Sequence, residues 1–239
     1  THVMEPLLTF NDDLEIEGLL AKDWETEDNK TWTVHLREGI KFHNGEPFDA
    51  EAVAFTFSDE MFLSDTNPNN WQLSYIEDVE VVDKYTVKFH LDKKVPLFPR
   101  DIAGGYTAIF PPEAKKKYGD KFGTQALVGT GPYKFKEWKH GEEIALERYE
   151  DYDHGPDFLR PGPAYIKKKV FRIIPEATTR IQSLIHGNMD FTPSVATKFV
   201  PQLREADNVG VKIQPAYGVQ FMHFNLDNEI LQEKKVRQA

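Results

Sequence analysis

The residues best suited to chemistry in this chain are its histidines, and their spacing argues against a catalytic metal site. They are His2, His35, His43, His90, His140, His154, His186 and His223. A helical zinc site of the metalloprotease type needs two histidines four positions apart with a glutamate between them, and no pair fits. The chain has no cysteine, which excludes thiolate ligands, disulfides and cysteine nucleophiles. We therefore predict no metal site and no cofactor.

Three other sequence patterns that could indicate a binding or catalytic site do not meet the requirements of their motifs. The glycine-rich run 129–133 lacks the Gly-Lys-Ser/Thr ending of a phosphate loop, and Pro132 removes one amide donor. The acidic run 151–155 echoes a calcium loop, but position 161, where a bidentate glutamate is needed, is proline. None of the five serines lies in a Gly-x-Ser-x-Gly elbow. An enzyme is not expected, and Gly129 to Tyr133 is interpreted as a backbone turn before a strand.

Composition narrows the class of protein. The 239 residues are 40% hydrophobic and carry a net charge of −10, which fits a globular domain and disfavours nucleic-acid binding. No apolar run approaches the ~20 residues that span a bilayer, and no signal peptide is recognised. Seventeen Phe, nine Tyr and four Trp supply a large core. The chain therefore needs no metal or disulfide to fold.

Hydrophobic periodicity predicts mixed α and β structure in the first half of the chain. Residues 4–8 and 16–21 are predicted to be helical. Alternation over 32–36 and over 79–91 predicts strands, the latter pair joined as a hairpin at Asp83-Lys84. Asp49 is placed to cap a helix over 50–57.

The second half continues with shorter elements. We predict a short helix from Pro111-Pro112 to Gly119, strands at 134–138, 144–148 and 170–174, and a helix from Pro175 to Gly187. A strand at 189–191, a helix at 196–205, a strand at 219–225 and a helix beginning at 229 follow. The Asp-, Gly- and Pro-rich stretch 151–163 is expected to be a surface loop or a joint.

Several segments together resemble one family. They are LAKDW at 20–24, KTWTVHLREGIKFHNGEPFDAE at 30–51, DKYTV at 83–87, GTGPYKF at 129–135, and the residues at 224–225 and 236–239. Their order and spacing are similar to those of the peptide/nickel class of extracellular solute-binding proteins that serve ABC importers. The resemblance runs along nearly the whole chain, and the segment 30–51 is the most specific part of it.

The resemblance implies an α/β fold in which two lobes close on a ligand by hinge motion. This chain would be a type II periplasmic-binding-protein-like lobe with an inserted β-rich subdomain, the second lobe being largely missing. Residues 1–30 and 162–225 would form the sheet core of lobe I, residues 31–161 the inserted subdomain, and residues 226–239 the start of the crossing to lobe II.

The resemblance also implies which residues face the ligand. The loop with Trp71, the segment with Tyr106, the loop with Thr192 and Ser194, and the strand with Phe221 and His223 resemble cleft-lining stretches. Aromatic side chains in such places are what a ligand cleft uses. The family implies no catalytic residue, an extracytoplasmic location in the periplasm or as a cell-surface lipoprotein, and a monomer that delivers its solute to a permease and ATPase complex.

The ligand is expected to be a peptide, the commonest substrate of the family. Nickel chelates come second, because residues 44–51 and 174–180 are similar to nickel-binding members; Arg100 is the only arginine in the segment where those members carry one, and it lies early. Oligosaccharides, held on aromatic platforms, come third. A hydrolase is the distant alternative, motivated only by a cleft and by 39 acidic residues.

Overall fold

The computed structural model describes residues 2–156, 158–159, 162–193, 195–214 and 222–238, in two units, Thr1–Ile173 and Ile174–Ala239. Unit 1 contains β1 (Leu8–Phe10), β2 (Ile16–Gly18), β3 (Ala21–Glu25), β4 (Thr31–Leu36), α1 (Ala50–Thr56), the 3-10 turn η1 (Asn70–Gln72), β5 (Ile76–Asp83), β6 (Thr86–Leu91), α2 (Phe98–Asp101), η2 (Gly105–Thr107), α3 (Pro112–Tyr118), η3 (Gly119–Lys121), β7 (Tyr133–Lys139), β8 (Glu143–Arg148) and β9 (Lys168–Arg172). Unit 2 contains α4 (Ala177–Ile185), η4 (Thr197–Phe199), α5 (Val200–Glu205), α6 (Glu229–Gln232) and α7 (Lys234–Gln238).

The N-terminal segment forms a small hairpin, so the predicted helices at 4–8 and 16–21 are wrong. β1 and β2 pair antiparallel, with Leu8 opposite Gly18. Between them the Asn11 side chain accepts hydrogen bonds from the amides of Asp13 (3.0 Å) and Glu15 (2.9 Å), which closes the turn. A short apolar run satisfies helical and strand periodicity equally well, and here cross-strand pairing decides the outcome.

The main sheet of unit 1 has the strand order β3-β4-β6-β5, with all neighbours antiparallel. Alternate side chains of β4 and β6 are buried, as the period-2 pattern predicts: Trp32, Val34, Leu36, Val87, Phe89 and Leu91. The β5–β6 hairpin at Asp83-Lys84 is confirmed. Its turn is closed by the Asp83 carboxylate, which accepts the amide hydrogen of Tyr85 at 2.8 Å.

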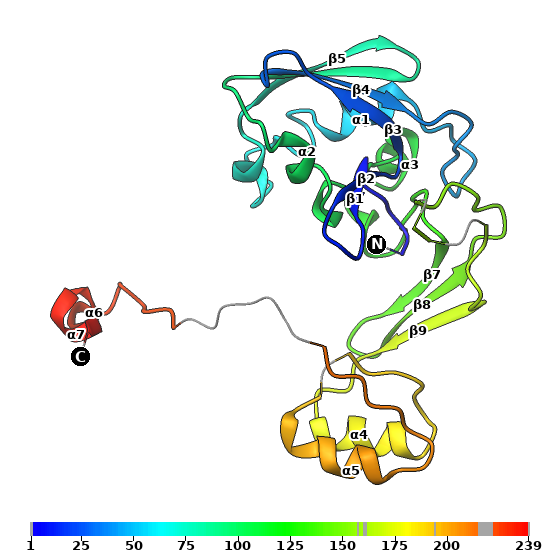
Figure 1. The fold of residues 1–239 in the computed structure, drawn as a ribbon, viewed down its shortest axis with the longest axis vertical. Coiled ribbons are helices and arrows are strands. Elements are labelled where there is room, and N and C mark those ends of the chain that lie inside the picture. Colours follow the sequence, from blue (N-terminus) through cyan, green and yellow to red (C-terminus); the bar gives the residue numbers. More distant parts are fainter. Residues whose placement is uncertain (1, 157, 160–161, 194, 215–221, 239) are drawn as a thin grey trace. The chain divides into compact units, whose positions relative to one another are not determined.

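Helix α1 covers one face of this sheet against β5 and β6 (Figure 1). It begins after Asp49 as predicted, although the cap is made by the backbone carbonyl of Asp49 and not by its side chain. Aromatic rings fill the space between the layers. Phe89 packs against Phe98 of α2 at 5.0 Å and against Phe57 at 5.2 Å between ring centroids. This core holds α2 in a fixed place beside the sheet.

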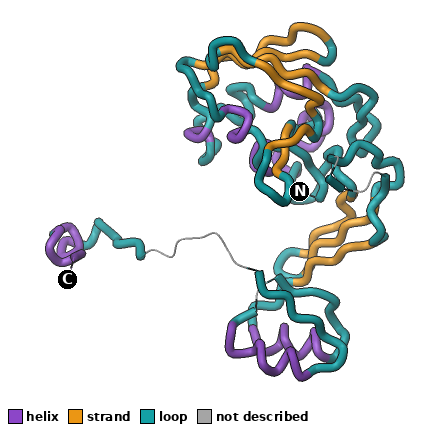
Figure 2. Tube along the Cα trace, in the orientation of Figure 1, coloured by secondary structure: helices purple, strands orange, loops and turns teal. Residues whose placement is uncertain are grey.

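A second sheet of three strands, β7-β8-β9, lies in the same unit (Figure 2). Both pairs are antiparallel, with Ile144 of β8 opposite Trp138 on one side and Phe171 on the other. The strands predicted at 134–138, 144–148 and 170–174 are therefore confirmed within a few residues. Residues 168–172 return across the 149–167 connection to pair with β8.

The glycine-rich run 129–133 joins the chain's beginning to the second sheet. The Gly131 amide donates to the carbonyl of Val3, and the Tyr133 amide to the carbonyl of His2, both at 2.9 Å. A Cβ atom on Gly131 would lie 2.7 Å from the His2 carbonyl oxygen, and one on Gly129 would overlap the Val3 carbonyl. Both glycines are required because two backbones touch here.

Beside this contact lies a buried carboxylate, Glu5, which is 2% exposed. It accepts hydrogen bonds from the hydroxyls of Thr130 (2.8 Å) and Tyr152 (2.7 Å), and lies 3.0 Å from Nε2 of His154. Buried charge is tolerated only when it is fully hydrogen-bonded, as it is here. Burial and the nearby carboxylate raise the pKa of the Tyr152 hydroxyl. We call Glu5, Thr130, Tyr152 and His154 the Glu5 cluster.

His43 also holds the glycine-rich run, through both nitrogens of its ring. Its Nε2 lies 2.7 Å from the Gly131 carbonyl, and its Nδ1 accepts the amide hydrogen of Gly129 at 3.4 Å. A protonated ring would place a second N–H against that amide, so the neutral form is required. Burial is the main cause that lowers the pKa of His43 to about 4.

This arrangement predicts a loss of stability in acid. An unfolded His43 binds a proton near pH 6.5, whereas the folded one does so only near pH 4. The stabilisation is therefore present above pH 6.5 and is lost as the pH falls toward 4, by about 2 to 3 kcal/mol. We expect the free energy of unfolding, measured in urea at several pH values between 7 and 4, to fall less in His43→Gln than in the parent protein. If the free energy of unfolding falls equally with pH in the two proteins, the lowered pKa of His43 is contradicted.

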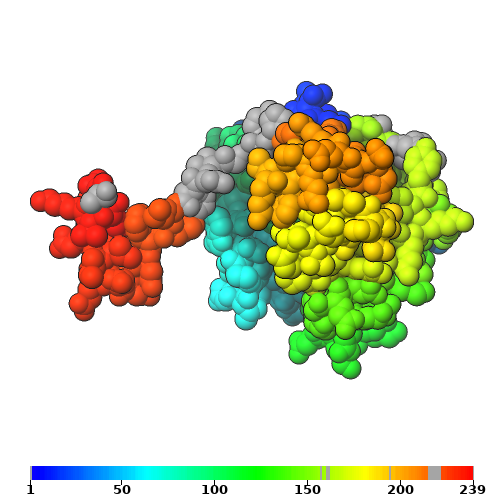
Figure 3. Space-filling view, turned by 90° about the horizontal axis from the view of Figure 1, so that it is seen from below, coloured from blue at the N-terminus to red at the C-terminus, as the bar shows by residue number. Residues whose placement is uncertain are grey.

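Unit 2 is mainly helical. The helices predicted at 175–187 and 196–205 are confirmed as α4 and as η4 followed by α5, and Figure 3 shows these residues (yellow and orange) forming one continuous surface. The Asn208 side chain donates to the Ile185 carbonyl at 3.0 Å and satisfies the end of α4. No strand forms at 189–191 or at 222–225, so these predictions are wrong for the residues described; 219–221 lie outside them.

Candidate functional site

The six residues predicted to face a ligand divide between the two units. Trp71 and Tyr106 belong to unit 1, Thr192 and His223 to unit 2, and Ser194 and Phe221 lie outside the described residues. Thr192 is half-buried in the loop after α4, and His223 is exposed. Trp71 and Tyr106 are both exposed in unit 1, and the segments that carry them are linked through Asp101, which bonds both Tyr75 and Tyr106.

Trp71 lies in η1 with its side chain 69% exposed. Four residues later Tyr75 is buried, and its hydroxyl donates to Oδ2 of Asp101 at 2.5 Å. This hydrogen bond ties the segment before β5 to the end of α2 (Figure 1). Burial, followed by the bond to the Asp101 carboxylate, raises the pKa of the Tyr75 hydroxyl. Tyr75 therefore remains a protonated donor that holds Asp101 in place.

Tyr106 lies in η2, five residues beyond Asp101, and is 46% exposed. Its hydroxyl donates to the backbone carbonyl of Asp101 at 3.0 Å, so one residue anchors both tyrosines. Partial burial and the nearby Asp101 charge raise the pKa of Tyr106. The turn that carries the ring is fixed by buried Thr107, whose hydroxyl lies 3.0 Å from the Ile102 carbonyl and 2.7 Å from that of Gly104.

Gly104 lacks room for a side chain because of its neighbour Tyr106, and its own backbone conformation is not the reason. Its φ of −84° and ψ of 148° are ordinary extended values that any residue adopts. A Cβ atom at this position would, however, overlap the ring of Tyr106. The ring is therefore folded back onto Gly104, and its exposed part faces outward. We call Trp71, Tyr75, Asp101, Gly104 and Tyr106 the aromatic surface.

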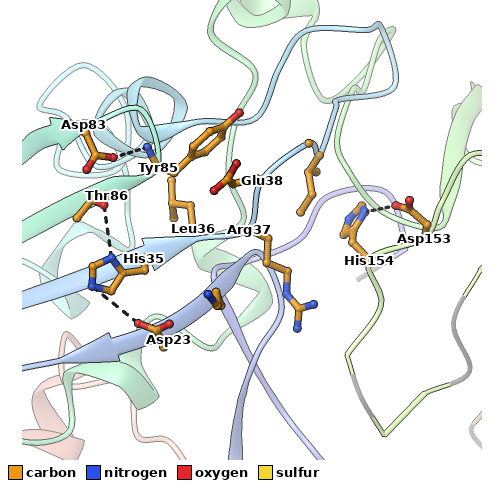
Figure 4. A pocket seen from close by; sticks show the side chains of 13 residues that line it. Asp23, His35, Leu36, Arg37, Glu38, Asp83, Tyr85, Thr86, Asp153 and His154 are labelled. Atoms are coloured by element: carbon orange, nitrogen blue, oxygen red, sulfur yellow. Dashed lines mark hydrogen bonds and ion pairs between the residues drawn. The ribbon is translucent and has the colours of Figure 1, made fainter.

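A separate hollow of about 930 Å³ lies over β3, β4 and β6 and reaches Asp153 and His154 (Figure 4). Its polar groups are engaged with one another. His35 lies between the Thr86 hydroxyl (3.4 Å) and the Asp23 carboxylate (3.8 Å), and His154 belongs to the Glu5 cluster. Arg37 differs, because its buried Nε has no hydrogen-bond partner.

This hollow does not select a ligand by charge. Its lining mixes four carboxylates, Asp23, Glu38, Asp83 and Asp153, with Lys22 and Arg37. None of the four predicted ligand residues that the structure describes lines it. Solute sites are lined mostly by apolar and aromatic side chains, and Leu36, Ile40 and Tyr85 are the only large ones of this kind among the described residues that line the hollow. We therefore regard the aromatic surface as the candidate site and the hollow as a solvated depression.

Among the described residues, no group of three or more His, Asp or Glu side chains could hold a metal ion, and no helix is long and apolar enough to cross a membrane. The family model for bacterial extracellular solute-binding proteins, family 5 (middle), matches residues 15–239. The chain belongs to this family. The resemblance found in the segments at 20–24, 30–51, 83–87 and 129–135 is thereby confirmed.

Individual relatives of this family 5 chain differ in what their names say they bind. It is 30% identical over 232 residues to the oligopeptide-binding protein AppA of Bacillus subtilis, covering 94% of this chain and 39% of AppA. It is 34% identical over 192 residues to the nickel-binding periplasmic protein of Escherichia coli, covering 79% of this chain and 35% of that protein. The chain thus spans well under half of the length of these relatives.

The fold agrees with the same family. The structure of AppA from Bacillus subtilis in complex with a nonapeptide superposes with a TM-score of 0.85 at 26% identity, covering 99% of this chain and 46% of that one. The predicted mixed α/β class with a periplasmic-binding-protein-like fold is therefore confirmed for this family 5 chain, which covers less than half of that structure.

Sequence reasoning predicted Trp71 and Tyr106 as ligand residues, which stays a prediction, and gave no indication of the residues bonded around them. Tyr75, Asp101 and Gly104 have ordinary types in ordinary places, and nothing in the sequence links position 75 to position 101. The useful signal was a glycine two positions before an exposed aromatic residue. For this family 5 chain that spacing marks a ring folded against a backbone without a side chain.

Proposed function

We propose that this chain is part of the substrate-binding component of an ABC importer, which captures di- or oligopeptides outside the membrane and delivers them to a permease and ATPase complex. The observation that carries the proposal is the pair of exposed aromatic residues Trp71 and Tyr106, whose segments are joined by the hydrogen bonds of Asp101 with Tyr75 and Tyr106, in a chain of family 5. The relative AppA, named as oligopeptide-binding and solved with a nonapeptide, supports the peptide class.

The proposed mechanism is capture without chemistry. A ligand that packs on the aromatic surface of one lobe and meets the second lobe on its other side loses contact with water, and its polar groups are satisfied by the protein. Because the closed form binds the ligand better, binding shifts the population toward closure, and the transporter recognises that shape. No residue of this chain is assigned a catalytic role, and the whole protein is proposed to act as an extracytoplasmic monomer, in the periplasm or as a lipoprotein.

The proposed division of the chain follows the family. Residues 1–30 and 162–225 would form the sheet core of lobe I, residues 31–161 the inserted subdomain, and residues 226–239 the crossing toward lobe II. Strands β3 and β4 lie on either side of the first junction and pair with each other, so that junction would run through a continuous sheet. Thr192, Ser194, Phe221 and His223 stay proposed ligand residues alongside Trp71 and Tyr106.

A nickel chelate is the second candidate ligand, favoured by the 34% identity to the nickel-binding relative. Native mass spectrometry of the full-length protein as purified, with metal analysis of the same sample, separates the two. We expect a distribution of bound peptide masses and no stoichiometric nickel. One small adduct with equimolar nickel would replace the peptide proposal by the chelate. A protein that also fails to bind peptides, chelates and sugars in a calorimetric screen would contradict solute binding itself.

A further inference from the structure

Tyr106 offers a ligand an unusual combination of groups. Its ring is nearly half exposed, yet its hydroxyl is occupied by the Asp101 carbonyl at 3.0 Å. The phenolic hydrogen is therefore committed within the protein. What remains for a ligand is the ring, which recognises another apolar group by packing and by removal of water, and a hydroxyl oxygen that can accept a hydrogen bond but has no hydrogen left to donate.

Two contacts prevent the ring from turning its hydroxyl outward. The Asp101 carbonyl holds the hydroxyl end, and Asp101 itself is held by Tyr75 through the 2.5 Å hydrogen bond. At the other side the ring lies against Gly104, at a distance that no Cβ atom would allow. The turn between them is closed by Thr107. The pose of the ring is thus built into the loop before any ligand arrives.

We infer that Tyr106 is a specificity-determining residue that selects an apolar side chain of the bound peptide, and that Gly104 and Asp101 are the residues that position it. The inference rests on the proposed peptide-binding function and adds which part of the ligand this lobe recognises. Gly104 acts only through Tyr106, because its own backbone angles require no glycine.

The substitution Gly104→Ala separates this role from a structural one. The atoms that a new Cβ would meet are the far end of the Tyr106 side chain, so the ring can move away without displacing the backbone. We expect the free energy of unfolding to change little and the ring to leave its place. NMR of protein labelled at tyrosine Cζ should show the Tyr106 signal, assigned with Tyr106→Phe, titrating at lower pH in Gly104→Ala once its hydroxyl is released.

The binding experiment uses the full-length protein and a pool of tripeptides Ala-X-Ala, in which X is Leu, Phe, Ser or Asp. We expect the parent protein to capture the Leu and Phe peptides best. Tyr106→Ala and Gly104→Ala should each weaken that capture about tenfold, and Tyr106→Phe less than threefold. In the Tyr106→Ala background, Gly104→Ala should have no further effect, since its action passes through the ring.

The outcomes distinguish the inference from the proposed function. If the parent protein captures no tripeptide, the inference fails, and the peptide function fails with it only when native mass spectrometry also finds no bound peptide. If it captures them but Gly104→Ala and Tyr106→Ala bind as well as the parent, peptide binding stands and the role of Tyr106 is overturned. A loss in Tyr106→Phe as large as in Tyr106→Ala would show that the hydroxyl meets the ligand, and would likewise overturn the inference.

Discussion

Replacing Glu5 by alanine should lower the free energy of unfolding by about 3 to 5 kcal/mol, the range for breaking a buried charged cluster by removing one partner. The Glu5 carboxylate satisfies two hydroxyls and one ring nitrogen in a place that is 2% exposed. Without it, the hydroxyl of Tyr152 and the ring of His154 stay buried without their acceptor, and a cavity is left. Urea unfolding at pH 7, followed by tryptophan fluorescence, measures the loss.

A matched control is an exposed carboxylate that also has a partner. Glu113 lies 3.2 Å from Lys116 on the solvent side of α3, and Glu113→Ala should cost under about 1 kcal/mol. Glu5→Gln provides an intermediate variant, because its amide keeps the size but brings two donors where three donors already point. We expect it to cost about 1 to 3 kcal/mol. A Glu5→Ala protein as stable as Glu113→Ala would contradict the assignment of the Glu5 cluster as a structural centre.

The second large effect is expected from Gly129→Ala. The new Cβ would overlap the backbone carbonyl of Val3, which cannot move without breaking the bonds that hold residues 2 and 3 to residues 131 and 133. Overpacking usually costs 1 to 3 kcal/mol when side chains can adjust, and with backbone in the way we expect about 3 kcal/mol or more. The denaturant midpoints of the two proteins give the difference in the free energy of unfolding when that free energy falls equally steeply with denaturant concentration in both.

Gly210→Ala is the control for this substitution, because a Cβ atom there would meet nothing within 4 Å. It should change stability by less than about 0.5 kcal/mol. Should Gly129→Ala prove as stable as Gly210→Ala, the close approach of the two backbones would be refuted. If Gly129→Ala does not fold at all, Gly131→Ala, whose Cβ would lie 2.7 Å from the His2 carbonyl oxygen, serves as the milder variant.

The sequence predicted the parts of the fold whose signal is local and repeated. The alternation in β4 and β6 and the helical face after Asp49 were sufficient, because one buried face of a sheet or helix dictates the pattern. The N-terminal hairpin was missed, because a strand of three residues, such as Leu8–Phe10, carries too little periodicity to distinguish it from a helical turn. Its pairing depends on Asn11, whose role is visible only in three dimensions.

In the candidate site, too, some residues were predicted from the sequence and others are recognised only in the structure. Trp71 and Tyr106 were predicted as ligand residues from family resemblance, which indicates positions without saying how the side chains are held. The anchoring hydrogen bond from Tyr75 to Asp101 joins residues 26 positions apart, and no local pattern encodes it. His43 was a similar case, since its sequence neighbours gave no indication of the contact with Gly131, 88 positions away.

The Glu5 cluster also has a consequence for the order in which the chain folds. Glu5 and His154 are 149 positions apart, and Glu5 and Thr130 are 125 apart. Closing loops of that length reduces the entropy of the chain before the new contacts stabilise it, and folding is slower in proteins that have many such distant contacts. During synthesis from the N-terminus, Glu5 emerges long before Thr130, Tyr152 and His154, so its hydrogen bonds are complete only after His154 has been made. Glu5 is therefore fixed in place late, although it is synthesised before the residues 125 to 149 positions further on that hold it.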